Sequence, residues 1–466
     1  MLRLSPFITL LFILFLAACQ PNPTNDSTWL VGKIDNPTQE YVIIKHNRNQ
    51  LDTVKIDDTN FFRYKFKKPV TEGMYSFEHG ESYPFYIAQG DSLLLLANTL
   101  DFESSLYFTN DHAAENNLLL KLNHRLRNDG FFWSELHEYS PEEFTEELAK
   151  REKENRKLLS DFKLNNPNVT SRFLRIAEGV IEQDIFLNKE RYLQVNQSDE
   201  FNAIDIPEDF YRHREKISFQ KDTMEVYYPY YRLLHTYIDN KVLESFNRKS
   251  FFNRSDFELN KHKLNLIDSL VDNQDIKNCL LYTSTRSFLL YSKNKSEEDE
   301  FLSLHNELSS CPLSKNTLTD LRAFTAQIKP GNKAPNIPLL TYYNTEVNLL
   351  DIINQPTVLF FWSKKDIQHQ KVIHTRAKEL HAKYPEYSFI GINTDGHFKR
   401  WRSEIESIGY DKDNEYQLFD PKTAEKQLVI TSHNKVLILD SNGVIRNGHI
   451  NIYHRSIENE LLQYLN

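Results

Sequence analysis

The spacing of apolar residues changes twice along the chain, and this limits the fold more than any other feature. Residues 28–112 contain short runs rich in β-branched and aromatic residues, separated by Asn, Asp, Pro and Gly, which is typical of strands joined by turns. Residues 113–328 carry apolar positions at helical spacing, and residues 329–466 alternate between the two patterns. A chain of 466 residues is also too long for one compact core.

The sequence therefore predicts a multidomain α+β protein with three folded segments. We expect an antiparallel, sandwich-like β domain at 28–112, an all-helical domain at 113–328 and an α/β domain at 329–466. Two local signals are specific. The residues QGDS at 89–92 predict a turn, and Ser140-Pro141-Glu142-Glu143 predicts the start of a helix that runs to about Asn165.

The first residues predict export and a lipid anchor. Arg3 precedes an apolar run of about ten residues, too short to cross a bilayer, and Leu16-Ala17-Ala18-Cys19 follows. This tetrapeptide resembles the lipobox of bacterial lipoproteins, which implies a signal peptide at 1–18, a lipid on Cys19 and a polar tether at 19–27. Because several acyl chains anchor stably, we expect a membrane-bound chain in the cell envelope. The alternative is an ordinary signal peptide with an incidental cysteine.

Charge and composition narrow the range of partners. The net charge is −9 and the pI is near 6, with both signs interspersed, so the chain lacks the basic patch that nucleic-acid binding requires. The segment after Cys19 has no dense acidic run, which favours a periplasm-facing anchor. Besides the membrane itself, we expect an envelope protein or peptide as partner, and no cofactor.

Five ordered features give the last segment a family resemblance. They are GNKAPNIPLL at 331–340, VLFFW at 358–362, GINTDG at 391–396, Trp401 and LILDSNGVI at 437–445. Together they resemble the TlpA-like and AhpC/TSA-like proteins of the thioredoxin superfamily, which implies a thioredoxin-like fold for residues 329–466. The β segment likewise resembles a small domain at the front of envelope lipoproteins from Bacteroidetes-like bacteria.

The residues that carry the chemistry of that family are absent. Its redox-active members place Cys-x-x-Cys three residues after the Phe-Trp pair, and here Asp366 and His369 occupy those positions. Disulfide exchange needs one thiolate to attack and a second to resolve, and residues 329–466 contain no cysteine. Peroxidase and copper-chaperone functions are excluded for the same reason, because both require cysteine sulfur at this site. The family's cis-proline position holds Asn434, whose peptide bond we expect to be trans.

The polar residues near this helix also have a plain explanation. Asp366, His369, His374 and His381 could suggest a metal site or an acid–base pair, but only His374 and His381 share a helix face, and they are seven residues apart. We therefore expect Asp366 to cap the helix, the histidines to be solvated, and no metal site in this segment.

Two cysteines remain in the helical segment. Cys279 and Cys311 are 32 residues apart on successive predicted helices. An oxidising compartment favours a disulfide between them, and the alternative is two buried, inert thiols. A catalytic pair is less favoured, because neither cysteine has a Cys-x-x-Cys partner.

These observations lead to three hypotheses about function. The first is an envelope lipoprotein whose degenerate thioredoxin-like domain binds or positions a partner without thiol exchange. The second follows the family's usual role and makes the chain a periplasmic thiol-disulfide oxidoreductase that uses Cys279 or Cys311. The third is capture of a peptide or glycan by the β domain or the helical domain, for which no residue set marks a site.

Overall fold

The computed structural model describes residues 27–46, 49–127, 138–196, 204–219, 228–248, 250–454 and 456–464. The predicted signal peptide, Cys19 and all of the predicted tether except its last residue lie outside these ranges. The chain divides into two compact units. The first runs to His124 and takes in Val169–Leu174, and the second comprises Arg125–Asn168 and Arg175–Asn466.

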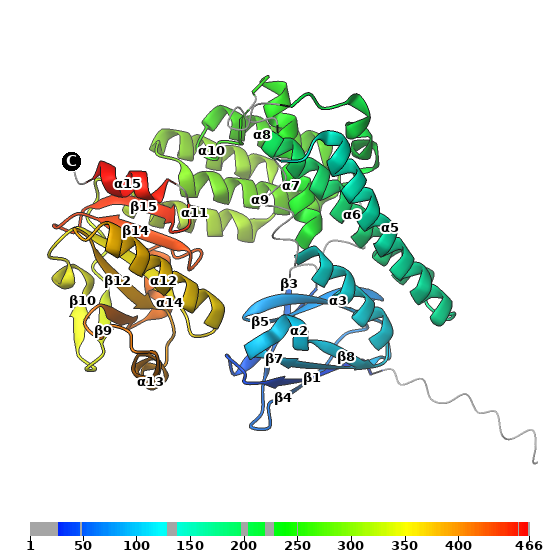
Figure 1. The fold of residues 1–466 in the computed structure, drawn as a ribbon, viewed down its shortest axis with the longest axis horizontal. Helices are drawn as coiled ribbons and strands as arrows, with labels where there is room; N and C mark the ends of the chain where they lie inside the picture. Colours follow the sequence, from blue (N-terminus) through cyan, green and yellow to red (C-terminus); the bar gives the residue numbers. More distant parts are fainter. Residues whose placement is uncertain are drawn as a thin grey trace, which may run out of the picture. The chain divides into compact units, whose positions relative to one another are not determined.

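The first unit contains two four-stranded sheets. One has the order β4(Phe61–Lys65), β1(Trp29–Asp35), β7(Ser92–Asn98), β8(Tyr107–Asn110), and the other has the order β3(Asn49–Lys55), β2(Tyr41–His46), β5(Gly73–His79), β6(Glu81–Ile87). Alternate residues such as Leu30, Leu95 and Phe77 are fully buried in one shared core. Also in this part of the chain are η1(Thr99–Asp101), α2(Phe102–Ser105) and α3(Ala113–Arg127) (Figure 1).

The predicted antiparallel pattern of this domain is wrong for one pair of strands. β1 and β7 run parallel, with Trp29 opposite Ser92 and Asp35 opposite Asn98, whereas the other pairs of the two sheets are antiparallel. The chain passes through both sheets between these two strands and returns in the same direction. The predicted turn before β7 is confirmed: Gly90 has a φ of 90°, and the carboxylate of Asp91 accepts a hydrogen bond from the Ala88 N–H (2.6 Å).

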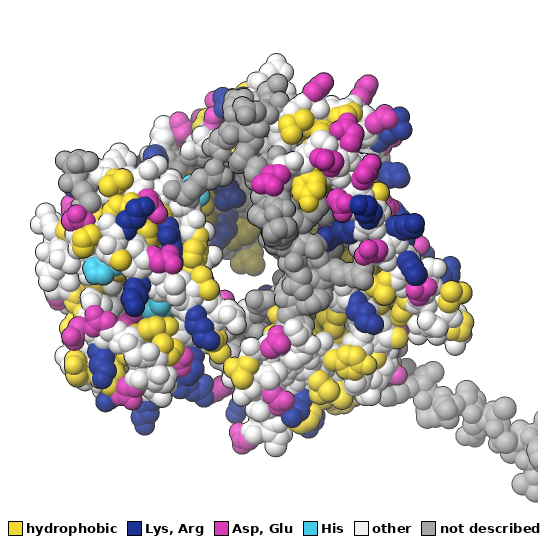
Figure 2. Space-filling model, viewed as in Figure 1, with side chains coloured by type: hydrophobic (Ala, Val, Ile, Leu, Met, Phe, Trp, Pro, Cys, Tyr) yellow, Lys and Arg dark blue, Asp and Glu magenta, His cyan; other side chains and the backbone are white. Residues whose placement is uncertain are grey.

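Helices form the first part of the second unit, although α6 begins within the segment Val169–Leu174 of the first unit. They are α5(Pro141–Asn165), α6(Ser171–Asn196), η3(Glu208–Lys216), α7(Tyr228–Ser245), α8(Phe257–Leu270), α9(Gln274–Tyr291), α10(Lys295–Leu308) and α11(Pro312–Gln327). The predicted start of α5 is confirmed, because Ser140 and Glu143 form a reciprocal capping box. Among the described residues, none of these helices is long and apolar enough to cross a membrane. Figure 2 shows acidic and basic side chains interspersed over the face that it presents.

A mixed seven-stranded sheet forms the rest of this unit. Its order is β10(Glu346–Asn348), β9(Pro338–Thr341), β13(Glu415–Leu418), β12(Ser388–Asn393), β11(Thr357–Trp362), β14(Lys435–Leu439), β15(Ile445–Asn451). The central pair β11 and β12 is parallel, and the β14–β15 hairpin is antiparallel to β11. With the helices η5(Leu349–Ile352), α12(Ile367–Lys383), α13(Phe398–Ile408), α14(Pro421–Gln427) and α15(Ile457–Gln463), this is the thioredoxin-like order that the sequence predicts.

Helices cover both faces of this sheet. Val358, Phe360 and Trp362 of β11 pack on one face with α12, α13 and α15. Leu359 and Phe361 pack on the opposite face with α14, and there Leu321, Phe324 and Ile328 from the end of the helical region join the same core. Figure 1 shows α11 reaching the edge of the sheet beside β15. The thioredoxin-like sheet and the last helices therefore share one hydrophobic core.

At Gly448 of β15, the thioredoxin-like sheet lies very close to the end of the helical region. A Cβ atom at this position would lie 1.9 Å from the backbone oxygen of Ile328, which no side-chain rotation can relieve. We predict that Gly448→Ala lowers the free energy of unfolding by about 1–3 kcal/mol, the usual cost of overpacking. Urea unfolding followed by tryptophan fluorescence measures it. The control is Gly396→Ala, whose Cβ would meet nothing within 4 Å. Equal stability of the two variants would contradict this account.

A buried histidine joins three helices of the helical region. His305 of α10 is fully buried, and its ring nitrogens lie within hydrogen-bond distance of Thr285 Oγ1 on α9 (3.1 Å) and Ser314 Oγ on α11 (3.3 Å). Burial, together with the positive charge of Lys315, lowers the pKa of His305 from 6.5 to about 4. The folded chain therefore holds this imidazole neutral.

This burial has a consequence for stability at low pH. Below pH 6.5 His305 binds a proton in the unfolded chain but stays neutral in the folded chain. The free energy of unfolding therefore falls as the pH drops from 6.5 to about 4. We predict that His305→Gln removes on the order of 3 kcal/mol of this pH-dependent loss. Urea unfolding at pH 7 and pH 4 measures the difference between the two chains. Parallel pH profiles of stability for the native chain and the variant would show that folding does not lower the pKa of His305.

Candidate functional site

The site that corresponds to the family's redox centre lies where β11 and β12 end and α12 begins. The turn after β11 is held by Asp395, whose carboxylate accepts hydrogen bonds from Ser363 Oγ (2.7 Å) and the Lys364 N–H (2.7 Å). The carboxyl ends of two parallel strands meet at the same sheet edge, and this brings residues 363 and 395 together.

Asp366 plays the predicted capping role. It is the N-cap residue of α12, and its side chain accepts a hydrogen bond from the His369 N–H (2.8 Å). A carboxylate at this end of a helix satisfies a free N–H group and interacts favourably with the helix dipole. The first of the two family cysteine positions therefore holds a structural group.

The second cysteine position and the cis-proline position contact each other directly. His369 Nε2 lies 2.9 Å from Asn434 Oδ1, so the imidazole donates a hydrogen bond to the amide oxygen. The described residues include no cis peptide bond, so the peptide before Asn434 is trans, as predicted. The two departures from the family pattern thus form one polar contact.

His433 completes this group, and sequence analysis did not pair it with His369. Its Nε2 lies 2.9 Å from Thr394 Oγ1, and its ring centroid lies 5.7 Å from that of His369. Burial lowers the pKa of both imidazoles, and for His433 the neighbouring His369 adds to this effect. Both rings are therefore held in the neutral form near pH 7. The pair of His369 and His433 could not be predicted, because the two residues lie 64 positions apart in the sequence.

His374 and His381 have separate surroundings. His381 is exposed, and its Nδ1 lies 3.0 Å from the backbone oxygen of Tyr387. The prediction of a solvated histidine is wrong for His374, whose side chain is only 11% exposed and stacks on Tyr410 at 3.8 Å. Its Nε2 lies 3.0 Å from Glu415 Oε1, a residue that the sequence did not single out.

Glu415 is a buried carboxyl group on β13, next to β12 in the sheet. It also accepts a hydrogen bond from Trp362 Nε1 (2.9 Å), and a Cβ on Gly391 would lie only 2.4 Å from it. Burial raises the pKa of Glu415, and the hydrogen bond from His374 opposes this shift. Because His374 Nδ1 donates to the Gln370 oxygen (2.7 Å), a single proton lies between His374 and Glu415. This pair fixes α12 against β13.

The two remaining thiols are not joined. Cys279 and Cys311 are both half-buried and each keeps its sulfur unbridged, although their segments are neighbours, since Asn278 Oδ1 accepts a hydrogen bond from the Ser310 N–H (3.0 Å). Of the two structural alternatives for this pair, the structure contains the unbridged one. Cys311 is the N-cap of α11, and a helix of 16 residues is about 24 Å long. This thiol therefore lies at the end of α11 remote from Phe324 and the sheet.

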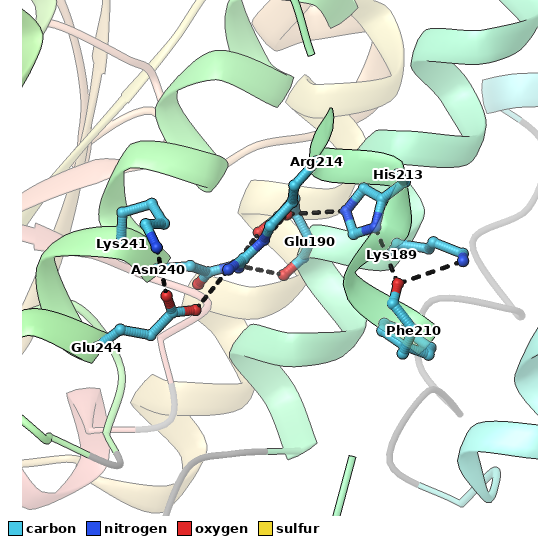
Figure 3. Close-up of polar contacts among 8 residues, drawn as sticks. All are labelled: Lys189, Glu190, Phe210, His213, Arg214, Asn240, Lys241 and Glu244. Carbon is cyan, nitrogen blue, oxygen red and sulfur yellow. Dashed lines mark hydrogen bonds and ion pairs between the residues drawn. The ribbon is translucent and has the colours of Figure 1, made fainter. Parts of the chain in front are cut away.

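A second polar cluster lies in the helical region (Figure 3). Glu190 of α6 is fully buried, and its carboxylate accepts hydrogen bonds from His213 Nε2 (2.8 Å), from Arg214 Nε (2.7 Å) and Nη2 (2.9 Å), and from Asn240 Nδ2 (2.6 Å). Burial would raise the pKa of Glu190, but the hydrogen bonds from His213 and Arg214 outweigh it and lower the pKa to about 2. Arg214 also donates to Glu244 (2.7 Å).

This cluster is a structural device. Both oxygens of Glu190 are fully engaged by groups of the chain itself, so none of its lone pairs is left for a ligand. Its members come from α6, η3 and α7, and the cluster holds the short helix η3 against two long ones. The sequence did not predict it, because charged residues at this spacing are indistinguishable from a solvated helix face.

Removing the positive charge from this cluster tests its role. We predict that Arg214→Met lowers the free energy of unfolding by about 3–5 kcal/mol, because the carboxylate of Glu190 stays buried without its main partner. The control is Arg212→Met on the same helix, whose ion pair with Asp209 is 74% exposed on both sides and should change stability by less than about 1 kcal/mol. Urea unfolding followed by circular dichroism compares the variants. A small loss in Arg214→Met would show that the cluster is solvated in solution.

Comparison with known proteins gives likeness to solved structures over part of the chain. No family model and no curated protein matches. A putative thiol-disulfide oxidoreductase from Bacteroides vulgatus matches at 18% identity over 30% of this chain and 98% of that one, with a TM-score of 0.26. A putative thiol:disulfide interchange protein DsbE from Chlorobium tepidum matches at 19% identity over 30% of this chain and 99% of that one, with a TM-score of 0.26. A thioredoxin-like protein from Bacteroides caccae matches at 14% identity over 54% of this chain and 89% of that one, with a TM-score of 0.36. At these values the thioredoxin-like assignment rests on the strand order of this chain.

Proposed function

We propose that this protein is a lipid-anchored component of the cell envelope whose thioredoxin-like domain binds or positions a protein or peptide partner and exchanges no disulfides. The observation that carries this proposal is the hydrogen bond between His369 and Asn434. It places two polar, non-sulfur groups in contact where a redox relative would hold a thiol and a proline.

The surrounding scaffold supports a binding role. Asp395 and Asp366 hold the turn and the start of α12, and Glu415 fixes the same helix to β13. These contacts maintain the geometry of the site although residues 329–466 contain no sulfur nucleophile. A rigid surface without reactive atoms is suited to recognition.

The anchor is the part of the proposal that the N-terminal sequence supports. A lipid on Cys19 would hold the folded units at a membrane surface through a polar tether, most simply on the periplasmic side. Substituting Cys19 by Ser should then move the chain from the membrane fraction to the soluble fraction.

An insulin-reduction assay tests the absence of thiol exchange. We predict that the native chain reduces insulin no faster than dithiothreitol alone, because the site holds no thiol that could attack a disulfide. The matched gain-of-function variant is Asp366→Cys/His369→Cys, with or without Asn434→Pro, and it should exceed the native rate at least tenfold.

The competing function is a thiol-disulfide oxidoreductase that uses the thiols of the helical region, and their unbridged state is the observation in its favour. Activity of the native chain above background would overturn the proposal. If Cys279→Ser or Cys311→Ser then abolished that activity, the competing function would be established.

A further inference from the structure

The hydrogen bonds around His369 fix which of its ring nitrogens carries the proton. Its Nε2 faces the amide oxygen of Asn434, which can only accept, so the proton is on Nε2. A neutral imidazole then has an unprotonated Nδ1 with a lone pair. This Nδ1 is buried and has no hydrogen-bond partner within the described residues. A buried acceptor without a donor indicates a missing water, ion or ligand.

The same reasoning applies to His433. Thr394 Oγ1 lies 3.4 Å from the backbone oxygen of Trp362, which can only accept, so the hydroxyl donates there. The hydroxyl oxygen therefore accepts from His433 Nε2 at 2.9 Å, which puts the proton of this ring on Nε2 as well. Two adjacent neutral imidazoles thus each have Nδ1 as a free electron-pair donor.

The separation of the two rings suits one shared metal ion. Imidazole nitrogens bind Zn²⁺ at about 2.0–2.1 Å, and each nitrogen lies about 1.1 Å from its own ring centroid, so two imidazoles on one ion have centroids about 5–6 Å apart. The observed distance between the centroids of His369 and His433 is 5.7 Å.

Charged side chains of both signs lie near His433. The carboxylates of Asp366 and Asp395 both act on His433, and Lys365 is the positive side chain that opposes them there. Within the described residues, no three His, Cys, Asp or Glu side chains are grouped as a metal site. The chain would therefore supply two ring nitrogens and leave the other coordination positions open.

We propose that His369 and His433 form a two-histidine site for a divalent transition metal ion of the kind that imidazole prefers, such as Zn²⁺ or Cu²⁺, at the position of the lost redox centre. Water or a side chain of a partner would complete the coordination. This site could not be predicted from the sequence, because the two ligands come from α12 and from the loop before β14. The inference is independent of whether the chain exchanges disulfides elsewhere.

Calorimetric titration with Zn²⁺ at pH 7.5 tests the site. The full chain is purified without a polyhistidine tag and stripped with a chelator. We expect binding of one ion, and at least tenfold weaker binding in His369→Gln and in His433→Gln. Glutamine keeps a donor for Asn434 or Thr394 but removes the Nδ1 lone pair. The double variant should bind at least as weakly as either single variant, because a single imidazole cannot form the chelate.

The control is His381→Gln, the same substitution on the same helix, which should leave the affinity unchanged. Circular dichroism and the urea midpoint of the metal-free chains confirm that each variant folds. Electron paramagnetic resonance of the native chain with one equivalent of Cu²⁺ should show hyperfine coupling to two imidazole nitrogens, and this readout decides the matter if a variant fails to fold. Unchanged Zn²⁺ affinity in both single variants, or a Cu²⁺ signal without two nitrogens, would overturn the proposal.

Discussion

The burial of strand β11 on both faces is the constraint on which the second unit depends. All six of its residues are buried, and its parallel neighbour β12 must be covered in the same way. The helices α12, α13 and α15 cover one face. The other face needs the end of the helical region, because α14 has only seven residues. The helical region is therefore part of the sheet's core, and Gly448 allows the contact to be close.

This shared core ties the packing of the thioredoxin-like sheet to that of the helical region. The sheet buries apolar side chains of α9 and α11. Changes in β11 or β14 would expose the surface of those helices as well. The stability of the whole unit therefore depends on the frame of the sheet, whatever the site does.

Features fixed by local spacing could be predicted from the sequence. The capping box at Ser140, the N-cap at Asp366 and the turn at Gly90 each depend on residues within four positions of one another. The strands and helices of the last segment follow from periodicity in the same way. The order of the sheet followed from the resemblance to a known family, because periodicity alone does not pair strands.

Features that join distant segments were missed. Glu415 lies 41 residues from His374, and Arg214 lies 24 residues from Glu190, so neither pair leaves a local pattern. The parallel pairing of β1 and β7 likewise depends on the path of the chain between them. A charged residue destined for burial has the same identity as one that faces water, and only its partner distinguishes them.

The contact between His369 and Asn434 joins the two positions at which this chain differs from the pattern of redox-active thioredoxin-like proteins. In a redox relative, a helix N-terminus stabilises a thiolate, which is a negative group. Here Asp366 occupies the position of that thiolate, and the imidazole of His369 at the second cysteine position is neutral and turns its proton toward Asn434. Its remaining lone pair is an electron donor of intermediate softness, as is that of His433 beside it. A lone pair of this kind is suited to binding a metal ion, whereas disulfide exchange requires a thiolate.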